Sequence, residues 1–343
     1  MKNILTLFVL ISITVISCTK EKTPSPIQIL FPSFENSNLK MEVVSSSFPD
    51  ENDGDIHFFN GETGIISTSS GNIYKTVDGG MNWNKKYSDP SGHYLQQILF
   101  EGNAVGYVVG YSHSNDWTGV ILKTIDGGET WQNIFELPGA EFETIAANTN
   151  GDLFVSNHGE LVESHDHGLT WTENLIPSIR NIIKITFSHG LGFCVGQDSS
   201  SKGIILRSDD NGSSWHEAGT FNSIYYIDDI AFADGTGYCI ADLHLIYKTT
   251  DDGDSWTQVY DAVSRTYKLD PLSSSNCLIW GAGPYTGGDF GTYYGAVRQS
   301  KDSGATWAEN IFNDISGIQH TSFYSPTHGY AIAGSTLIKV TIK

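Results

Sequence analysis

The sequence predicts an all-β fold, a seven-bladed β-propeller of four-stranded antiparallel blades, and three observations support this prediction. An eight-residue motif occurs six times, and its tryptophans lie 48, 40, 44, 41 and 51 residues apart, a period that suits blades of about 40 to 50 residues. Short apolar segments without a long helical period separate the motifs. The last repeat ends without the motif or a fourth strand, so a strand from elsewhere must complete it.

Composition excludes several classes of protein. The chain has 343 residues, of which 36 are glycine, 39% are hydrophobic and only 17% are charged. This composition predicts a packed core with many turns and excludes global disorder. The 19 basic and 39 acidic residues give a net charge of −20. That charge repels phosphate backbones and anionic lipid headgroups, so nucleic acid is not an expected partner.

The N-terminus has the pattern of an export signal. Lys2 precedes an apolar run from Ile4 to Ile16 that stops near Cys18 and is shorter than the ~20 residues of a membrane-spanning helix. Residues 1–17 are expected to be a signal peptide whose end resembles the bacterial lipobox, with Cys18 as the acylated first residue. An ordinary signal peptide with an incidental cysteine is the alternative.

Three segments follow from this pattern. Residues 1–17 are the expected signal and residues 18–38, with Pro24, Pro26 and Pro32, are an expected tether after the lipidated cysteine. Residues 39–343 are one propeller domain. The expected location is the bacterial cell envelope, with the protein held at the outer membrane through its lipid anchor alone.

The repeated motif reads Ser/Thr-x-Asp-x-Gly-x-Thr/Ser/Asn-Trp. A short aspartate accepts hydrogen bonds from nearby backbone N–H groups, the glycine adopts a positive φ, and the tryptophan packs between sheets. The positions are Asp78, Asp126, Asp166, Asp210, Asp251 and Asp302, with Trp83, Trp131, Trp171, Trp215, Trp256 and Trp307. We interpret the motif as structural. Calcium binding is the alternative, disfavoured because the loops lack the ligand spacing and closing glutamate of an EF-hand.

This motif resembles the Asp box, or BNR repeat, of sialidases, sortilin-type propellers, xyloglucan hydrolases and photosystem II assembly and stability factors. The resemblance to the last family is the most detailed. Its repeats also read Gly-Tyr-apolar-apolar-Gly followed by Lys-Thr-x-Asp-Gly-Gly-x-Thr-Trp, as in residues 106–110 and 123–131. The resemblance covers about residues 39–343 and implies a propeller with a general scaffold or assembly role. The basic patch with which that family binds chlorophyll proteins has no equivalent here.

Each repeat is expected to supply an inner strand ending near an aromatic residue, a second strand, a third leading into the Asp box, and a fourth after the tryptophan. Residues 39–48 are strand-like and precede the first full repeat. We expect them to pair with the last blade, close the ring and cover its exposed edge.

Three cysteines lie within the propeller. Cys194 and Cys239 stand where other repeats carry Val108 and Ala331, so the site is small and apolar. Together with Cys277 they are expected to be buried free thiols, with a disulfide or a metal site as the alternative.

We align the inner strands by their terminal aromatic residues. In each blade, this alignment places one polar or charged residue toward the central channel. These residues are Asp55, Gln97, Glu143, Lys184, Asp229, Lys268 and His320. They predict a wet, polar channel that is a candidate binding site. The alternative is that they only solvate a structural pore.

Loops between second and third strands form a second candidate site. They share one face with the loops entering the inner strands, and rings beside polar groups suit a sugar or peptide. The candidates are Tyr111, Asp116 and Trp117 in blade two and Tyr285, Asp289, Phe290, Tyr293 and Tyr294 in blade six. Packing of the long blade-six loop onto itself is the alternative.

Catalysis is the less favoured reading. Sialidases, by resemblance, bind a substrate carboxylate with three clustered arginines, whereas the four arginines here include Arg207 and Arg298 on outer strands. A glycosidase of neutral sugars needs two carboxylates, which Asp55, Asp116, Glu143, Asp229 and Asp289 offer. Xyloglucan hydrolases, however, hold substrate between two propellers. The leading hypothesis is a non-catalytic envelope scaffold that binds a protein or glycan without metal or cofactor.

Overall fold

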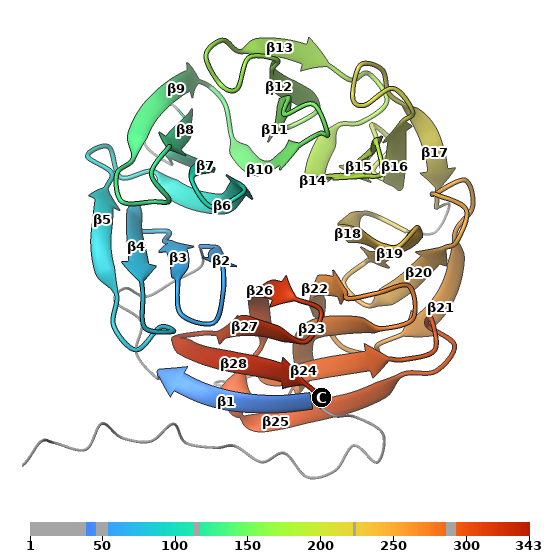
Figure 1. Cartoon of the computed structure of the whole chain (residues 1–343). Coiled ribbons are helices and arrows are strands. Elements are labelled where there is room, and N and C mark those ends of the chain that lie inside the picture. The colour runs from blue at the N-terminus through green and yellow to red at the C-terminus, as the bar shows by residue number, and fades with distance from the viewer. Residues whose placement is uncertain (1–38, 46–53, 113–116, 222–223, 286–292) are drawn as a thin grey trace, which may run out of the picture.

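The computed structural model describes residues 39–45, 54–112, 117–221, 224–285 and 293–343. In these ranges 28 strands form seven four-stranded antiparallel sheets, arranged as a ring around a central opening (Figure 1). The predicted seven-bladed propeller is confirmed. Within the same ranges, no helix is both long and apolar enough to cross a membrane.

The first six blades use their strands in chain order from the axis outward, and the last blade uses β26, β27 and β28 with β1 outermost. The innermost strands are β2 (Ile56–Phe58), β6 (Tyr94–Glu101), β10 (Phe142–Ala147), β14 (Asn181–Ser188), β18 (Ile227–Ala233), β22 (Thr266–Pro271) and β26 (Ile318–Ser325). The second strands are β3 (Gly64–Ser67), β7 (Val105–Ser112), β11 (Leu153–Asn157), β15 (Leu191–Gln197), β19 (Thr236–Ala241), β23 (Cys277–Tyr285) and β27 (His328–Ala333). The third strands are β4 (Asn72–Thr76), β8 (Thr118–Thr124), β12 (Glu160–Ser164), β16 (Gly203–Ser208), β20 (Leu245–Thr249), β24 (Tyr293–Ser300) and β28 (Thr336–Ile342). The outermost strands are β5 (Asn84–Ser88), β9 (Gln132–Pro138), β13 (Thr172–Leu175), β17 (His216–Thr220), β21 (Thr257–Asp261), β25 (Ala308–Ser316) and β1 (Leu39–Ser45).

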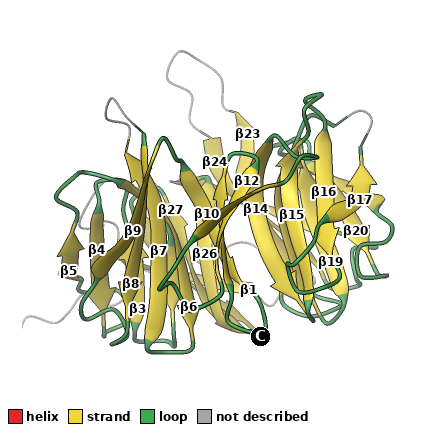
Figure 2. Cartoon of the chain, turned by 90° about the horizontal axis from the view of Figure 1, so that it is seen from above, coloured by secondary structure: helices red, strands yellow, loops and turns green. Residues whose placement is uncertain are grey.

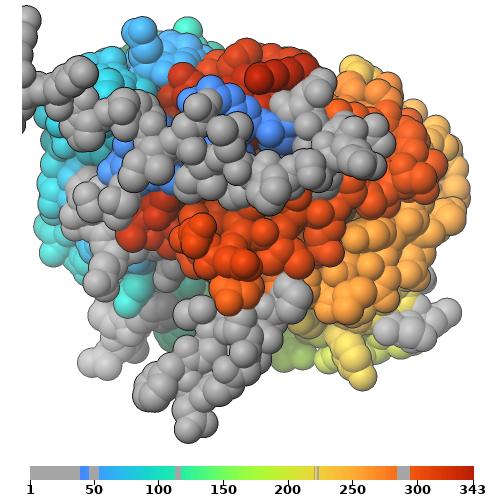
Figure 3. All heavy atoms as spheres, turned by 90° about the horizontal axis from the view of Figure 1, so that it is seen from below, coloured from blue at the N-terminus to red at the C-terminus, as the bar shows by residue number. Residues whose placement is uncertain are grey.

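The N-terminal strand closes the ring, as predicted. β1 pairs antiparallel with β28 as the outermost strand of the last blade, with Met41 opposite Val340. The N-terminal and C-terminal strands lie side by side on the rim (Figure 3). Met41 is 1% exposed and packs into the core between the sixth and seventh blades. Closure therefore depends on both backbone pairing and side-chain burial.

The propeller has two distinct faces because neighbouring strands alternate in direction. The loops entering the innermost strands and those between second and third strands leave one end of the blades, which we call the loop face. The Asp-box turns leave the opposite end, which we call the Asp-box face (Figure 2). A ligand at the loop face therefore meets no Asp box.

All six Asp boxes share one hydrogen-bond pattern, except that in the first box the Asn82 amide donates to the aspartate where the other boxes have a hydroxyl. In the second copy, the Thr124 hydroxyl donates to Asp126 Oδ1 and accepts from the backbone N–H of Gly128. The same carboxylate accepts the backbone N–H and hydroxyl of Thr130. These bonds lower the pKa of Asp126 to about 2. These hydrogen bonds all lie within the turn. The aspartate of the box therefore has a structural role.

A basic residue before the box joins neighbouring blades. Lys75 Nζ donates to the carbonyl of Gly127 in the next box at 2.8 Å, and Lys123 Nζ donates to that of His167 at 2.7 Å. Arg207 and Lys248 make the equivalent bonds to Asp252 and Ser303. Four basic residues thereby tie adjacent blades together at the Asp-box face.

The cores lie between neighbouring sheets and include the three cysteines. Cys194, Cys239 and Cys277 are buried free thiols in three different clusters of apolar side chains. Burial raises the pKa of each thiol, so they stay protonated. They act as small apolar core residues.

Candidate functional site

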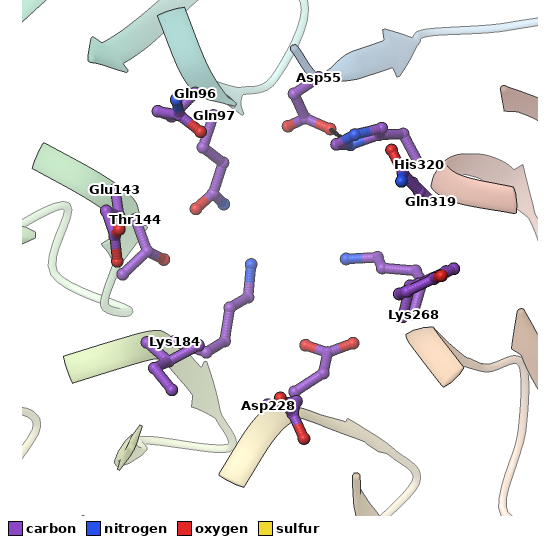
Figure 4. Close-up of a pocket in the computed structure, with 13 residues that line it drawn as sticks. Asp55, Gln96, Gln97, Glu143, Thr144, Lys184, Asp228, Lys268, Gln319 and His320 are labelled. Carbon is purple, nitrogen blue, oxygen red and sulfur yellow. Dashed lines mark ion pairs between the residues drawn. The ribbon is translucent and has the colours of Figure 1, made fainter. Parts of the chain in front are cut away.

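A polar cavity occupies the centre of the ring. All seven residues of the predicted channel ring line one cavity of about 200 Å³, together with Gln96, Thr144, Ile183, Asp228, Tyr267 and Gln319 (Figure 4). A second cavity of about 360 Å³ lies on the Asp-box side of the ring. Lys184, Asp229 and Lys268 line both cavities, so these three side chains form the waist of the channel.

Several ring side chains join one inner strand to the next. Asp55 accepts the backbone N–H of Ile98 in the following blade at 3.0 Å, and Asp229 accepts that of Leu269 at 2.9 Å. The second oxygen of each carboxylate accepts the N–H of the next residue in its own strand. Both carboxylates are therefore engaged in holding blades together.

Blade three corrects the sequence alignment by one residue. Gln97 accepts the backbone N–H of Ile145, as Asp55 accepts that of Ile98. Ile145 and Ile98 are thus equivalent, so Thr144 occupies the ring position. Glu143 lies one residue nearer the loop face and still lines the cavity. The alignment shifted because β10 has no terminal aromatic residue and contains an irregular register between Phe142 and Ile145.

The mouth of the cavity is acidic, yet two of its carboxyl groups titrate near neutrality. Burial, aided by the charge of Glu141, raises the pKa of Glu143 to about 7. Burial also raises the pKa of Asp228 to about 7. The Nδ1 atom of His320 lies 3.9 Å from Oδ1 of Asp55. The charge of the mouth consequently becomes less negative as the pH falls through 7.

The two lysines of the waist, Lys184 and Lys268, have pKa values that are shifted in opposite directions. Burial, and then the charge of Lys268, lower the pKa of Lys184 to about 8. Burial also disfavours the charge on Lys268, but Asp229, Asp270 and Asp55 outweigh it and raise its pKa. Both ammonium groups point into the cavity (Figure 4).

An aromatic ladder lies on the loop face of blade two. The rings of Tyr94 and Tyr111 stack with centroids 6.4 Å apart, and those of Tyr111 and Trp117 stack at 5.8 Å. Tyr94 is 37% exposed and Trp117 is 43% exposed. Burial, together with the charges of Glu141 and Glu143, raises the pKa of Tyr111 to about 12. Tyr94 is the first residue of β6, and Gln96 and Gln97 of the same strand line the cavity, so the ladder lies beside the cavity on its loop-face side.

Further apolar side chains, which no sequence motif marked, are exposed on this face. They are Leu175 at the end of β13, and Tyr225 and Val263 in the segments that enter β18 and β22. Val263 is 92% exposed and has a φ of 61°, which is rare for a β-branched residue. A strained, exposed valine on a face with exposed rings favours a binding role for that face.

The remaining predicted residues are only partly described. Asp116, Asp289, Phe290 and Cys18 lie outside the described residues. In blade six, the backbones of Tyr285 and Tyr293 pair where β23 and β24 meet their connecting loop, and Tyr294 is partly buried. Among the described residues, no group of three His, Cys, Asp or Glu side chains is placed to hold a metal ion.

Comparison with known proteins identifies the repeat. The family model for photosynthesis system II assembly factor YCF48 matches residues 37–188 and 174–336. The solved structure of YCF48 bound to D1 peptide is 18% identical, with a TM-score of 0.70, and covers 92% of this chain and 100% of that one. YCF48 from Cyanidioschyzon merolae is 16% identical, with a TM-score of 0.64, and covers 88% of this chain and 98% of its own.

An enzyme shares the architecture. The GH74 xyloglucanase from Xanthomonas campestris is 14% identical, with a TM-score of 0.66, and covers 87% of this chain but 53% of the enzyme. At such identities these likenesses show the fold alone. No curated protein matches the sequence.

Proposed function

We propose that this protein, which belongs to the photosynthesis system II assembly factor YCF48 family, is a non-catalytic scaffold that captures a segment of a partner protein on its loop face. The observation that carries this proposal is the stacked ladder of Tyr94, Tyr111 and Trp117 beside the cavity. Tyr94 and Trp117 are exposed, and the buried Tyr111 ring stacks with both of them. Exposed rings supply large contact areas at low entropic cost. A related YCF48 is bound to a D1 peptide, and we carry over only the general role of binding a protein segment.

The distribution of exposed apolar residues supports the loop face over the Asp-box face. On the Asp-box face, exposed apolar side chains lie in the first three boxes, but all of them are aliphatic: Val77, Met81, Ile125 and Leu169. On the loop face, by contrast, the ladder places three rings in contact. The net charge of −20 favours a segment that is neutral or basic over most of its length.

A comparison of two double variants tests the loop face. Tyr94→Ala with Trp117→Ala should weaken capture of a protein from envelope extract at least ~10-fold, since both rings are exposed and anchors at the centre of an interface cost ~2 kcal/mol or more when truncated. Val77→Ala with Ile125→Ala is the matched control on the opposite face. Equal capture by the two variants would refute the proposal.

A glycan is the second candidate partner, because aromatic rings also stack on the apolar faces of sugars. A glycan array probed with the same variants separates the two. Ladder-dependent glycan binding without ladder-dependent protein capture would replace the protein partner with a sugar.

The hydrolase alternative is less consistent with the geometry. Asp55 and Asp229 have both oxygens engaged by backbone N–H groups, which leaves Glu143 as the described carboxylate among the candidates without such a role. Turnover of a neutral glycoside by the wild type, lost in Glu143→Gln, would overturn the non-catalytic proposal.

The proposal includes anchoring to the bacterial envelope through an acylated Cys18, with residues 18–38 as the tether. It rests on the apolar run that stops near this cysteine. Each buried CH₂ of an acyl chain contributes ~0.8 kcal/mol to membrane binding, so Cys18→Ala should move the protein from the membrane to the soluble fraction. Retention of the variant in washed membranes would contradict lipid anchoring.

A further inference from the structure

The waist of the channel contains two ammonium groups without a bonded counterion. Among the described residues, no acceptor lies within hydrogen-bonding or ion-pair distance of Lys184 or Lys268. Their neighbour Asp229 uses both oxygens to accept the N–H groups of Ile230 and Leu269. Both lysines are partly accessible and line the cavities, so an anionic ligand that enters the channel meets two ammonium donors with no hydrogen-bond partner among the described residues.

The two lysines face the same space. Their ammonium groups point from β14 and β22 toward the middle of the cavity (Figure 4), and each lines both the loop-face cavity and the Asp-box-side cavity. The charge of Lys268 also lowers the pKa of Lys184, so the two groups repel each other. A single anionic group between them would relieve this repulsion and accept hydrogen bonds from both.

The surroundings decide which anion fits. The charged and titratable groups facing the lysines are Asp55 directly before β2, Glu143 from β10, Asp228 and Asp229 from β18, Tyr267 and Asp270 from β22 and His320 from β26, while β6 contributes only Gln96 and Gln97. This acidic lining makes a dianion such as phosphate costly. A monoanion with two acceptor oxygens matches two donors better.

We propose that the waist is a carboxylate-binding site in which one carboxylate group bridges the ammonium groups of Lys184 and Lys268. The ligand is a small free carboxylate or the terminal carboxylate of a peptide entering from the loop face. The cavity of about 200 Å³ accommodates such a group. Binding of a free carboxylate at this site does not depend on the proposed function. Binding of the terminal carboxylate of a peptide rests on it.

The site should bind more tightly as the pH falls from 8 to 6. Glu143 and Asp228, which each have a pKa of about 7, become neutral in this range, and Lys184, with a pKa of about 8, becomes fully charged. Both changes favour an anion at the waist.

Ligand-observed NMR with the full-length protein tests the site, using acetate as the probe and acetamide as its neutral counterpart. We expect acetate to bind and acetamide not to bind. Lys184→Met or Lys268→Met should weaken acetate binding at least ~10-fold. Lys202→Met, which removes a lysine from a loop on the same face, should leave binding unchanged. Lys268→Arg keeps the charge and should retain binding if a methionine variant fails to fold.

Two comparisons then separate the sources of the carboxylate. Trialanine with a free C-terminus binding more tightly than acetate, and more tightly than its C-terminal amide, would assign the site to a chain terminus. Acetate binding without trialanine binding would assign it to a free small carboxylate and leave the loop-face proposal to its own test. Tighter binding of inorganic phosphate than of acetate, or equal acetate binding by wild type and both methionine variants, would overturn the proposal.

Discussion

Closure of the ring by β1 leads to a quantitative prediction at Met41. This side chain is 1% exposed and packs with Leu278 and Val340 between the last two blades. Truncation of a buried methionine to alanine costs about 2–5 kcal/mol, from lost transfer free energy and the cavity left behind. For a domain of this size, 1 kcal/mol changes the melting temperature by ~2 °C. Met41→Ala should therefore lower the melting temperature by about 4–10 °C.

The neighbouring residue provides the control. The Lys40 side chain is 30% exposed and pairs with Glu42 on the surface at 2.8 Å, an interaction worth about 0–1 kcal/mol. Lys40→Ala should lower the melting temperature, followed by circular dichroism, by less than ~2 °C. Deleting residues 39–48 should destabilise the protein more than deleting residues 19–38. Equal melting temperatures for the two point variants, or for the two deletions, would refute closure by this strand.

Three further predictions concern the Asp box, a buried ion pair and the channel mouth. Thr124→Val should lower the free energy of unfolding by about 1–3 kcal/mol in urea titrations, because the buried N–H of Gly128 loses its acceptor. Glu309→Ala should cost about 3 kcal/mol in the same assay, since it leaves the guanidinium of Arg298, which is 0% exposed, without its carboxylate partner; a change below 1 kcal/mol would contradict this. Glu143 has a folded-state pKa of about 7 against an ordinary 4.5, so its folded form retains a proton between these values and stability falls as the pH rises through that window. Glu143→Gln should remove this decline, and its stability relative to wild type should increase from pH 5 to pH 7 and then level off.

The sequence predicted the features that repeat. The Asp-box period located six blades, and the incomplete last repeat indicated that the N-terminal strand completes the seventh. The alternation of polar and apolar residues also identified side chains that line the central cavity, because this alternation is a local property of a strand. The inner strand β10 has no terminal aromatic residue by which to align it. There the alignment chose Glu143 instead of Thr144.

Features that depend on contacts between blades were not predictable in the same way. The bond from Lys75 to the carbonyl of Gly127 joins residues 52 apart in the chain, and its sequence signal, a basic residue before several boxes, became meaningful only with the next blade in place. The strained conformation of Val263 is likewise set by its loop. Lys184 and Lys268 have no ion-pair partner among the described residues because both oxygens of the neighbouring Asp229 accept backbone N–H groups.

Because Asp229 accepts two backbone N–H groups, not every substitution in the channel reports on ligand binding. Asp229 is 4% exposed, and Asp229→Ala would leave the N–H of Leu269 without its acceptor, at a cost of about 1–3 kcal/mol. Loss of ligand binding in that variant would therefore reflect loosened blades as much as a lost contact. Lys184→Met removes a partly buried ammonium group that has no bonded partner among the described residues, so it should leave the melting temperature unchanged or raise it. If thermal melts instead showed Asp229→Ala to be as stable as wild type and Lys184→Met to be strongly destabilised, the assignment of Asp229 to structure and of the lysine to ligand binding would have to be reversed.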